Sequence, residues 1–397
     1  MREGTKMRQF GKWLGRALLA LIVAAVVIGL WKREEITRLL AVNSLFEAEK
    51  IVGNFSAMDQ AFLTAPVARG DGPTRDLTYG PETTLPASAD SWIAERKVTS
   101  LLVMKQGEIR YENYFLGTGP EDRRISWSIA KSYLSALFGV VLAEGAIAAV
   151  TDPVTKYVPA LKGSAYDGAT IEDVLQMESG VTFDEDYLDY DSDINRMGRV
   201  LALGGLMDDF AAGLTETDAT AGEAWKYVSI DTHIIGMVIR GATGRSISEL
   251  LSEKIIAPLG LEQSAYYVTD GAGVAFVLGG LNTTTRDYAR FGQMILNGGR
   301  VAETQVVPED WIDASTRPSA KTEPGKIGYG YQWWIPQGAH ETEYLGRGIY
   351  GQYLYIDEKA GVVIVVTSAD RAFRETGVHD ENIAMLRALT AHVSPEQ

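Results

Sequence analysis

A serine and a lysine lie three positions apart at the start of an apolar segment. Ser128 and Lys131 belong to "SWSIAKS", which runs directly into "YLSALFGVVLA". On a helix, positions i and i+3 share one face, so the lysine side chain is expected beside the serine. The apolar run predicts burial, and burial lowers the pKa of a lysine. A neutral lysine could then take the proton of the serine hydroxyl and make it a nucleophile.

The spacing alone is weak evidence, because about one S-x-x-K is expected by chance in a chain of this length. A serine at a helix start followed by a solvent-exposed lysine is the alternative. Tyr227 adds a second element, since it lies in "AGEAWKYVSIDTHIIG", in a loop just before a predicted helix. A phenol near a lysine ammonium can be stabilised as a phenolate and can pass a proton to a leaving group.

A third element lies in "GRGIYGQYLYID", near the C-terminus. Gly351 would let a strand backbone approach a ligand closely. The backbone N–H of Gln352 could then pair with the N–H of Ser128 to form an oxyanion hole.

The ordered set "SWSIAKS", "YVS" before "IDTHIIG", and "GIYGQYLYID" resembles the beta-lactamase-related serine hydrolases, as do "TIEDVLQMESGVTFDEDY" and "GGLNTTTRDYARFGQMILNGG". This penicillin-recognising fold includes class C beta-lactamases, family VIII esterases and 6-aminohexanoate-dimer hydrolase. The resemblance runs from about residue 54 to about residue 390. It implies Ser128 as nucleophile, Lys131 and Tyr227 as the proton-transfer pair, and an acyl-enzyme intermediate.

Two motifs depart from the family pattern. Ser229 stands where Tyr-x-Asn has an amide that would hold a substrate carbonyl. Ile349-Tyr350-Gly351 stands where Lys-Thr-Gly or His-x-Gly supplies a cation for a beta-lactam carboxylate. Both departures argue against beta-lactamase activity more than against hydrolysis, and Ser229, Ile349, Tyr350 and Gly351 are predicted to contact the substrate.

The acidic run "FDEDYLDYDSD", residues 183 to 193, has two interpretations. Such runs are usually solvated loops. In the family this loop overhangs the active site, which makes Asp186 and Tyr187 candidates for substrate contact.

Three functions remain open on this evidence. The favoured one is an exported serine acyl-hydrolase, an esterase or amidase acting on a small molecule; the alternatives are a beta-lactamase or D,D-peptidase, and a non-catalytic ligand-binding or sensor domain. The intact serine, lysine and tyrosine favour an enzyme. The chain has no cysteine, no G-x-S-x-G and no histidines at metal-binding spacing, so neither metal nor cofactor is expected. Its net charge of −15 argues against a nucleic-acid partner.

The N-terminus predicts a membrane segment. Five basic residues precede residues 17–31, which carry no charge: Arg2, Lys6, Arg8, Lys12 and Arg16. The segment approaches the roughly 20 residues that span a bilayer. We expect a single-pass anchor in the inner (cytoplasmic) membrane with the catalytic domain on the periplasmic side. A cleaved signal peptide and a secreted protein are the alternative.

The remaining chain predicts an α+β fold of the beta-lactamase/transpeptidase type, an antiparallel sheet flanked by helices and split by a mainly helical insertion. Apolar runs predict hairpins over residues 100–115 and 351–368, which can share one sheet. The expected divisions are 1–35, an anchor or signal; 36–99, a connector and surface arm; 100–135 with 300–397, the sheet domain; and 136–299, the helical domain.

Overall fold

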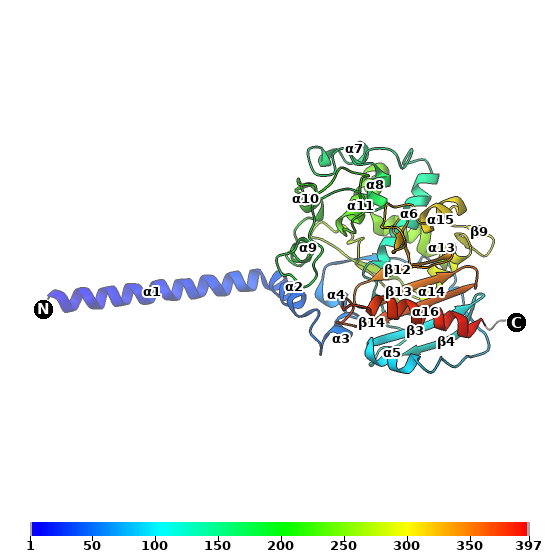
Figure 1. Cartoon of the computed structure of the whole chain (residues 1–397). Helices are drawn as coiled ribbons and strands as arrows, with labels where there is room; N and C mark the ends of the chain where they lie inside the picture. The colour runs from blue at the N-terminus through cyan, green and yellow to red at the C-terminus, as the bar shows by residue number, and fades with distance from the viewer. Residues whose placement is uncertain (1, 395–397) are drawn as a thin grey trace.

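The computed structural model describes residues 2–394, with side chains from residue 10 onward. Helix α1 (Arg2–Trp31) projects from the body of the protein, as Figure 1 shows. Its stretch Phe10–Trp31 has 22 residues and a mean hydropathy of 2.3, and none of it is buried against the rest of the protein. The helix is therefore long and apolar enough to be a membrane anchor or a signal segment. The structure does not describe the side chains of Arg2, Lys6 and Arg8.

The main sheet has eight strands in the order β10-β11-β12-β13-β14-β3-β4-β2. The strands are β10 (Gly328–Tyr329), β11 (Trp334–Ile335), β12 (Glu343–Gly348), β13 (Gln352–Asp357), β14 (Val362–Ser368), β3 (Val98–Lys105), β4 (Glu108–Tyr114) and β2 (Thr78–Tyr79). Strand β14 pairs antiparallel with β3, so the two predicted hairpins do share one sheet.

Both faces of this sheet are covered, which explains the unbroken apolar runs in β3 and β14. Along β3, Leu101 and Val103 pack with α5 (Ala89–Glu95) and α16 (Val378–Val393). The alternate residues Leu102 and Met104 belong to the larger core with α6 (Ile129–Ala143) and α14 (Thr285–Leu296). The period of two along a strand sends successive side chains into the two cores.

A second, four-stranded sheet has the order β1-β6-β7-β5 and lies beside the helical part. Its strands are β1 (Thr64–Val67), β6 (Ala265–Val268), β7 (Leu281–Thr283) and β5 (Arg124–Ile125). The other elements are α2 (Arg33–Ser44), α3 (Ile51–Asn54), α4 (Met58–Ala61), α7 (Val154–Tyr157), η1 (Pro159–Leu161), α8 (Ile171–Leu175), α9 (Asp193–Ala202), α10 (Met207–Ala212), α11 (Ile230–Thr243), α12 (Ile247–Leu251), η2 (Ser252–Ile256), α13 (Ala257–Leu259), β8 (Arg300–Val301), β9 (Thr304–Gln305) and α15 (Glu309–Thr316).

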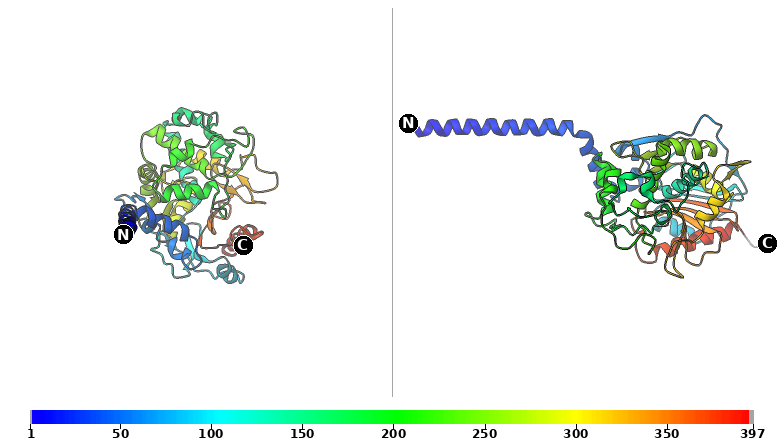
Figure 2. Two further views of the ribbon diagram at one scale, coloured as in Figure 1. Left: turned by 90° about the vertical axis from the view of Figure 1, so that its left-hand side faces the viewer. Right: turned by 90° about the horizontal axis from the view of Figure 1, so that it is seen from above.

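The packing of the structure crosses the divisions expected from sequence. Helix α14 falls in the stretch assigned to the helical domain, yet it packs against β3, β13 and β14. The arm before residue 99 contributes a strand to each sheet, because β1 pairs with β6 and β2 pairs with β4. The connector after α1 is helical, and its helix α2 packs against α9 (Figures 1 and 2).

Candidate active site

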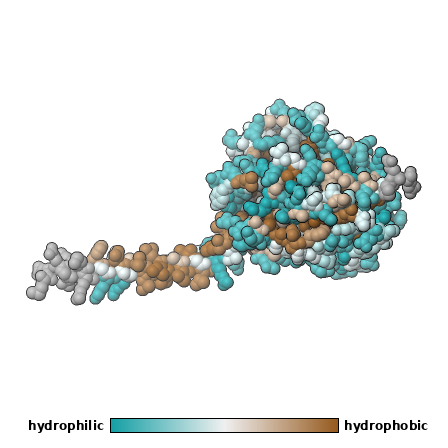
Figure 3. All heavy atoms as spheres, turned by 60° about the horizontal axis from the view of Figure 1, so that its bottom comes forward, coloured by the Kyte–Doolittle hydropathy of each residue, from teal (hydrophilic) through white to brown (hydrophobic). Residues whose placement is uncertain are grey.

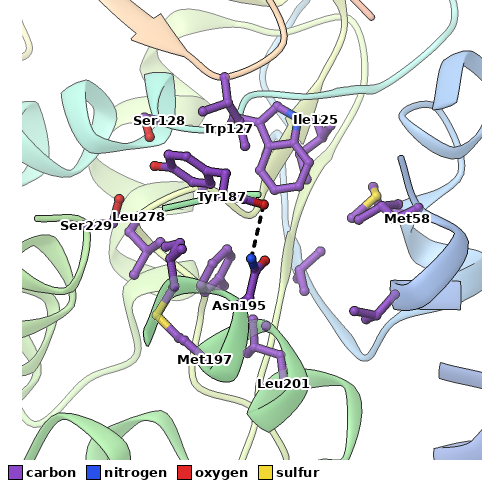
Figure 4. A pocket seen from close by; sticks show the side chains of 18 of the residues that line it. Met58, Ile125, Trp127, Ser128, Tyr187, Asn195, Met197, Leu201, Ser229 and Leu278 are labelled. Atoms are coloured by element: carbon purple, nitrogen blue, oxygen red, sulfur yellow. Dashed lines mark hydrogen bonds between the residues drawn. The ribbon is translucent and has the colours of Figure 1, made fainter. Parts of the chain in front are cut away.

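Ser128 is the N-cap residue of α6 and directly follows β5 and a short turn. The preceding residue, Trp127, has φ of +43°, a left-handed conformation that bulky residues rarely adopt. Its ring packs against Phe46, Phe55 and Tyr350, and this contact holds the strained turn in place. The turn positions the Ser128 hydroxyl at the N-terminus of a helix and on the wall of a cavity (Figure 4).

Lys131 lies one helical turn further on and is 1% exposed. Its Nζ donates hydrogen bonds to the carbonyl oxygen of Leu278, at 2.8 Å, and to Ser229 Oγ, at 3.3 Å. Burial lowers the pKa of Lys131 to about 7, while the carboxylates of Glu185 and Asp231 act in the opposite direction. A lysine with this pKa is partly neutral at physiological pH and can accept a proton.

Tyr227 comes from the loop before α11 and lies beside Lys131. The Lys131 Nζ is 5.5 Å from the centre of the tyrosine ring, and the ring packs on Trp334 at 4.9 Å. Burial and then the charge of Glu185 raise the pKa of Tyr227 above its ordinary value, and a hydrogen bond with Ser128 lowers it by less. Burial therefore favours the neutral phenol of Tyr227 over the phenolate that a nearby ammonium could stabilise, because desolvation disfavours the charged form.

Glu185 is a member of the site that the sequence analysis missed. One of its carboxylate oxygens accepts a hydrogen bond from the backbone N–H of Ser229, at 2.9 Å. The other accepts hydrogen bonds from the hydroxyls of Ser229 and Tyr187. The only sequence signal was its place in the acidic run, next to the two residues that were proposed. Ser229 thus bridges Lys131 and Glu185.

Asp231 was also missed. It is fully buried on α11 and accepts hydrogen bonds of 2.8 Å from Tyr166 and Ser179 at one carboxylate oxygen. Burial raises the pKa of Asp231 to about 7. Its sequence signal was the acid two positions after Ser229 in an otherwise apolar helix start.

The two residues proposed from the acidic run have different surroundings. Tyr187 lines the cavity, and its backbone carbonyl accepts a hydrogen bond of 3.1 Å from Asn195 of α9. Figure 4 shows Tyr187 between Ser128 and Asn195. The carboxylate of Asp186 instead pairs with Arg374, at 2.7 Å, and does not line the cavity.

The third motif is the turn between β12 and β13. Ile349 and Tyr350 line the cavity, and Tyr350 has φ of +60°. Gly351 has φ of +84°, but a side chain there would meet Ser368 rather than the nucleophile. The close approach is at Gly348, where a Cβ would lie 2.7 Å from the Ser126 carbonyl oxygen and 2.9 Å from the Trp127 Cβ.

The conformation of this turn decides which backbone N–H could join that of Ser128 in an oxyanion hole. Gln352 pairs with Gly348 at the end of the β12–β13 ladder, and its side-chain amide donates to the carbonyl oxygens of Ile349, Tyr350 and Ser368. Gln352 does not line the cavity, whereas Ile349 does. Among the described residues, the backbone N–H groups of Ser128 and Ile349 have no hydrogen-bond acceptor. The structure therefore favours Ile349 over Gln352 as the second donor.

A cation lies on the same strand, two positions before Ile349. The half-buried guanidinium of Arg347 lies 5.4 Å from the centre of the Trp334 ring, on which Tyr227 packs. The charge of Arg347 lowers the pKa of Tyr227, although burial outweighs it. The motif position itself carries no cation, since it is Ile349, but Arg347 supplies one nearby on the same strand.

The fold and this arrangement of Ser128, Lys131 and Tyr227 define a serine hydrolase of the beta-lactamase-related type. Comparison with known families agrees, because the family described as "Beta-lactamase" matches residues 90–387. The chain belongs to this family.

Known relatives include amide hydrolases. The chain is 31% identical over 336 residues to 6-aminohexanoate-dimer hydrolase of Paenarthrobacter ureafaciens, covering 79% of this chain and 84% of that protein. A solved structure of a candidate 6-aminohexanoate-dimer hydrolase from Bacillus anthracis superposes with a TM-score of 0.77 at 25% identity, covering 89% of this chain and 97% of the other. EstCE1, a hydrolase with promiscuous acyltransferase activity, shares the fold, with a TM-score of 0.61, 15% identity and coverage of 76% and 96%.

Proposed function

We propose that this protein is an exported serine acyl-hydrolase that cleaves an ester or amide through an acyl-enzyme on Ser128. The observation that carries the proposal is the buried Lys131, whose pKa of about 7 lets it act as a base one turn from the serine at the helix start. A structural role alone would not require a desolvated lysine without a carboxylate partner at salt-bridge distance.

In the proposed acylation step, the Ser128 oxygen attacks the substrate carbonyl carbon while the hydroxyl proton passes to Lys131. The backbone N–H groups of Ser128 and Ile349 donate to the developing oxyanion, at the positive end of α6. Collapse of the tetrahedral intermediate breaks the bond to the leaving group. Tyr227, a neutral phenol, donates the proton that the leaving alcohol or amine needs and regains one from Lys131.

Deacylation reverses these roles with water as the nucleophile. The free amine of Lys131, through Tyr227, takes a proton from the water as its oxygen attacks the acyl carbon. The Ser128 oxygen then leaves with that proton, which restores the free enzyme and releases a carboxylic acid. The overall reaction consumes one water molecule.

Substrates with a carboxylate on the leaving group are a second candidate class, and beta-lactams belong to it. Arg347 favours them, because its cation lies beside the tyrosine that would protonate the leaving group. The apolar Ile349 does not provide this charge. We place neutral esters and linear amides first, since the cavity next to Ser128 is lined by uncharged side chains.

The N-terminal helix supports a membrane location. Its basic flank and uncharged core would leave the N-terminus in the cytoplasm and the hydrolase domain on the periplasmic side of the inner membrane. Removal of α1 as a signal peptide would give a secreted enzyme.

The acyl-enzyme can be tested by rapid mixing of the full-length protein in detergent with p-nitrophenyl butyrate. We expect a burst of p-nitrophenol equal to the enzyme concentration, with a butyryl mass increase on the intact protein. Ser128→Ala should show neither. Linear release with substrate in excess, together with no butyryl mass increase on the protein, would contradict the covalent mechanism.

A further inference from the structure

An apolar cavity extends from the catalytic serine towards the segment that follows α1. Ser128 and Ile349 line this cavity, and so do Val42, Leu45 and Phe46 of the α2 region. Figure 4 shows Ser128 on its wall. Helix α9 forms another wall. None of the described side chains that line the cavity carries a charge. This lining suits a hydrocarbon chain and would leave a charged group without a partner.

The α2 residues that line this cavity follow α1 closely along the chain. Only Lys32 separates α1 from α2, and Val42 comes 11 positions after Trp31. At about 1.5 Å per helical residue, the cavity wall lies within roughly 17 Å of the end of the apolar helix. A bilayer that holds α1 must therefore come close to the cavity.

The surface beside this junction is unusually apolar for an exposed region. Ile36 and Leu40 of α2 are 44% and 63% exposed, and Leu203 and Leu206 after α9 are 52% and 42% exposed. Arg38 joins the two segments through a 2.9 Å hydrogen bond to the Ala202 carbonyl oxygen. Figure 3 shows that apolar surface on α1 is followed by further apolar surface where the helix meets the domain. Exposed apolar patches mark sites of contact with a membrane or with another protein, and the position of this one next to α1 favours the membrane.

The same segment also contacts the catalytic turn. Phe46 stacks on Tyr350 with ring centres 4.7 Å apart and lies 5.8 Å from the ring of Trp127, the residue before the nucleophile. The membrane-proximal segment is therefore part of the active-site wall and not a passive linker.

We propose that this cavity binds the acyl chain of a membrane-borne amphiphilic ester or amide, which enters from the bilayer beside α2 and places its carbonyl at Ser128. The inference rests on the proposed acyl-hydrolase function and names its substrate class. The acyl chain lies among the apolar walls, and the leaving group lies on the side of Tyr227 and Arg347.

A chain-length series tests the cavity. Full-length protein in detergent is assayed with p-nitrophenyl acetate, butyrate and octanoate, and kcat/KM is expected to rise at least about 10-fold from acetate to octanoate as methylenes are buried. Gly198 of α9 lines the cavity, and a Cβ built there meets no atom within 4 Å. Gly198→Phe should fill the space and reduce the octanoate-to-acetate ratio at least about 10-fold, whereas the matched Gly198→Ala should keep the ratio.

A linker insertion tests the membrane as the source. Twenty Gly/Ser residues inserted after Lys32 would let the domain move on the order of 25 Å from α1. In phosphatidylcholine vesicles, this variant should hydrolyse a bilayer-partitioned dodecanoyl ester at least about 10-fold more slowly than wild type. Its rate with water-soluble p-nitrophenyl acetate should be that of wild type, because Lys32 is outside the catalytic site.

The outcomes separate the two proposals. A flat chain-length profile, or equal rates of the linker variant and wild type on the vesicle-borne ester, would overturn the inference while Ser128 still formed an acyl-enzyme. Loss of α1 from the mature protein would also overturn it. Absence of turnover and of acylation with every ester would instead contradict the proposed function.

Discussion

The Nζ of Lys131 lies 3.3 Å from the Oγ of Ser229, and that serine also donates to Glu185. Ser229 therefore makes a connection that its motif position did not suggest, because its hydroxyl links the Lys131 ammonium or amine to the carboxylate of Glu185. The arrangement leaves Lys131 hydrogen-bonded to neutral oxygen atoms while negative charge acts from a greater distance. Burial consequently dominates the pKa of the lysine.

The first prediction concerns the pH profile. kcat/KM should rise as pH passes about 7, because Lys131 must lose its proton to act as a base. Glu185 raises the pKa of Lys131, so Glu185→Gln should move the acidic limb of the profile to lower pH. Asp186→Asn is the matched control, since Asp186 pairs with Arg374 outside the cavity. An unmoved limb in Glu185→Gln would contradict the electrostatic role of Glu185.

The second prediction is that Lys131 and Tyr227 act together in proton transfer. Lys131→Met and Tyr227→Phe should each lower kcat by roughly 10²-fold or more. The double variant should lose less than the product of the two single losses. Independent, multiplying losses measured with p-nitrophenyl butyrate would show that the two residues act separately.

The stability of Lys131→Met tests whether burial lowers the pKa of Lys131 in the native protein. The native pKa of about 7 is below the ordinary value of 10.5, so the unfolded chain binds more protons than the native one between these pH values. The free energy of unfolding should therefore rise with pH across this window for wild type. Lys131→Met should be the more stable protein at pH 7 and should lack this contribution. Equal slopes for both proteins in denaturant titrations would refute the buried, neutralised lysine.

The third prediction concerns Arg347 and Ile349. Wild type should prefer p-nitrophenyl butyrate to nitrocefin, because Ile349 gives an apolar surface where a charged residue would bind the beta-lactam carboxylate. Arg347→Ala should lower kcat/KM for esters with a carboxylate on the leaving group by about 10- to 100-fold, the value of one charged hydrogen bond. Ile349→Lys should improve nitrocefin turnover. A wild-type preference for nitrocefin would restore the beta-lactamase alternative.

The fourth prediction is topological. With the basic residues ahead of α1, a periplasmic reporter such as alkaline phosphatase fused after residue 397 should be active, and the protein should fractionate with membranes. Activity of a cytoplasmic reporter at the same position would reverse the assigned orientation. A mature N-terminus near Leu30 would indicate cleavage instead of an anchor.

Much of the fold could be predicted because its signals are local. The apolar runs of β3 and β14 mark the buried strands of the two predicted hairpins. The position of α14 could not be predicted, because its packing on the sheet depends on the three-dimensional return of the chain. Sequence patterns show which face of a helix is apolar but not which layer it covers.

Some residues of the candidate site could likewise be predicted from the sequence, and others could not. Ser128, Lys131 and Tyr227 were predictable from motif order, and the structure brings them together. Glu185 was hidden within an acidic run, where a buried carboxylate and a solvated one have the same sequence signature. The preference for Ile349 over Gln352 depends on the close approach at Gly348, which a glycine-rich turn does not specify. The burial that raises the pKa of Tyr227 could not be inferred from its motif position either.

The most direct test of the central claim is active-site labelling. Full-length protein in detergent is treated with a fluorophosphonate probe, digested and mapped by mass spectrometry. The account predicts one labelled peptide with the probe on Ser128, and no label in Ser128→Ala at unchanged thermal stability. Label on another residue, or full labelling of Ser128→Ala, would contradict it.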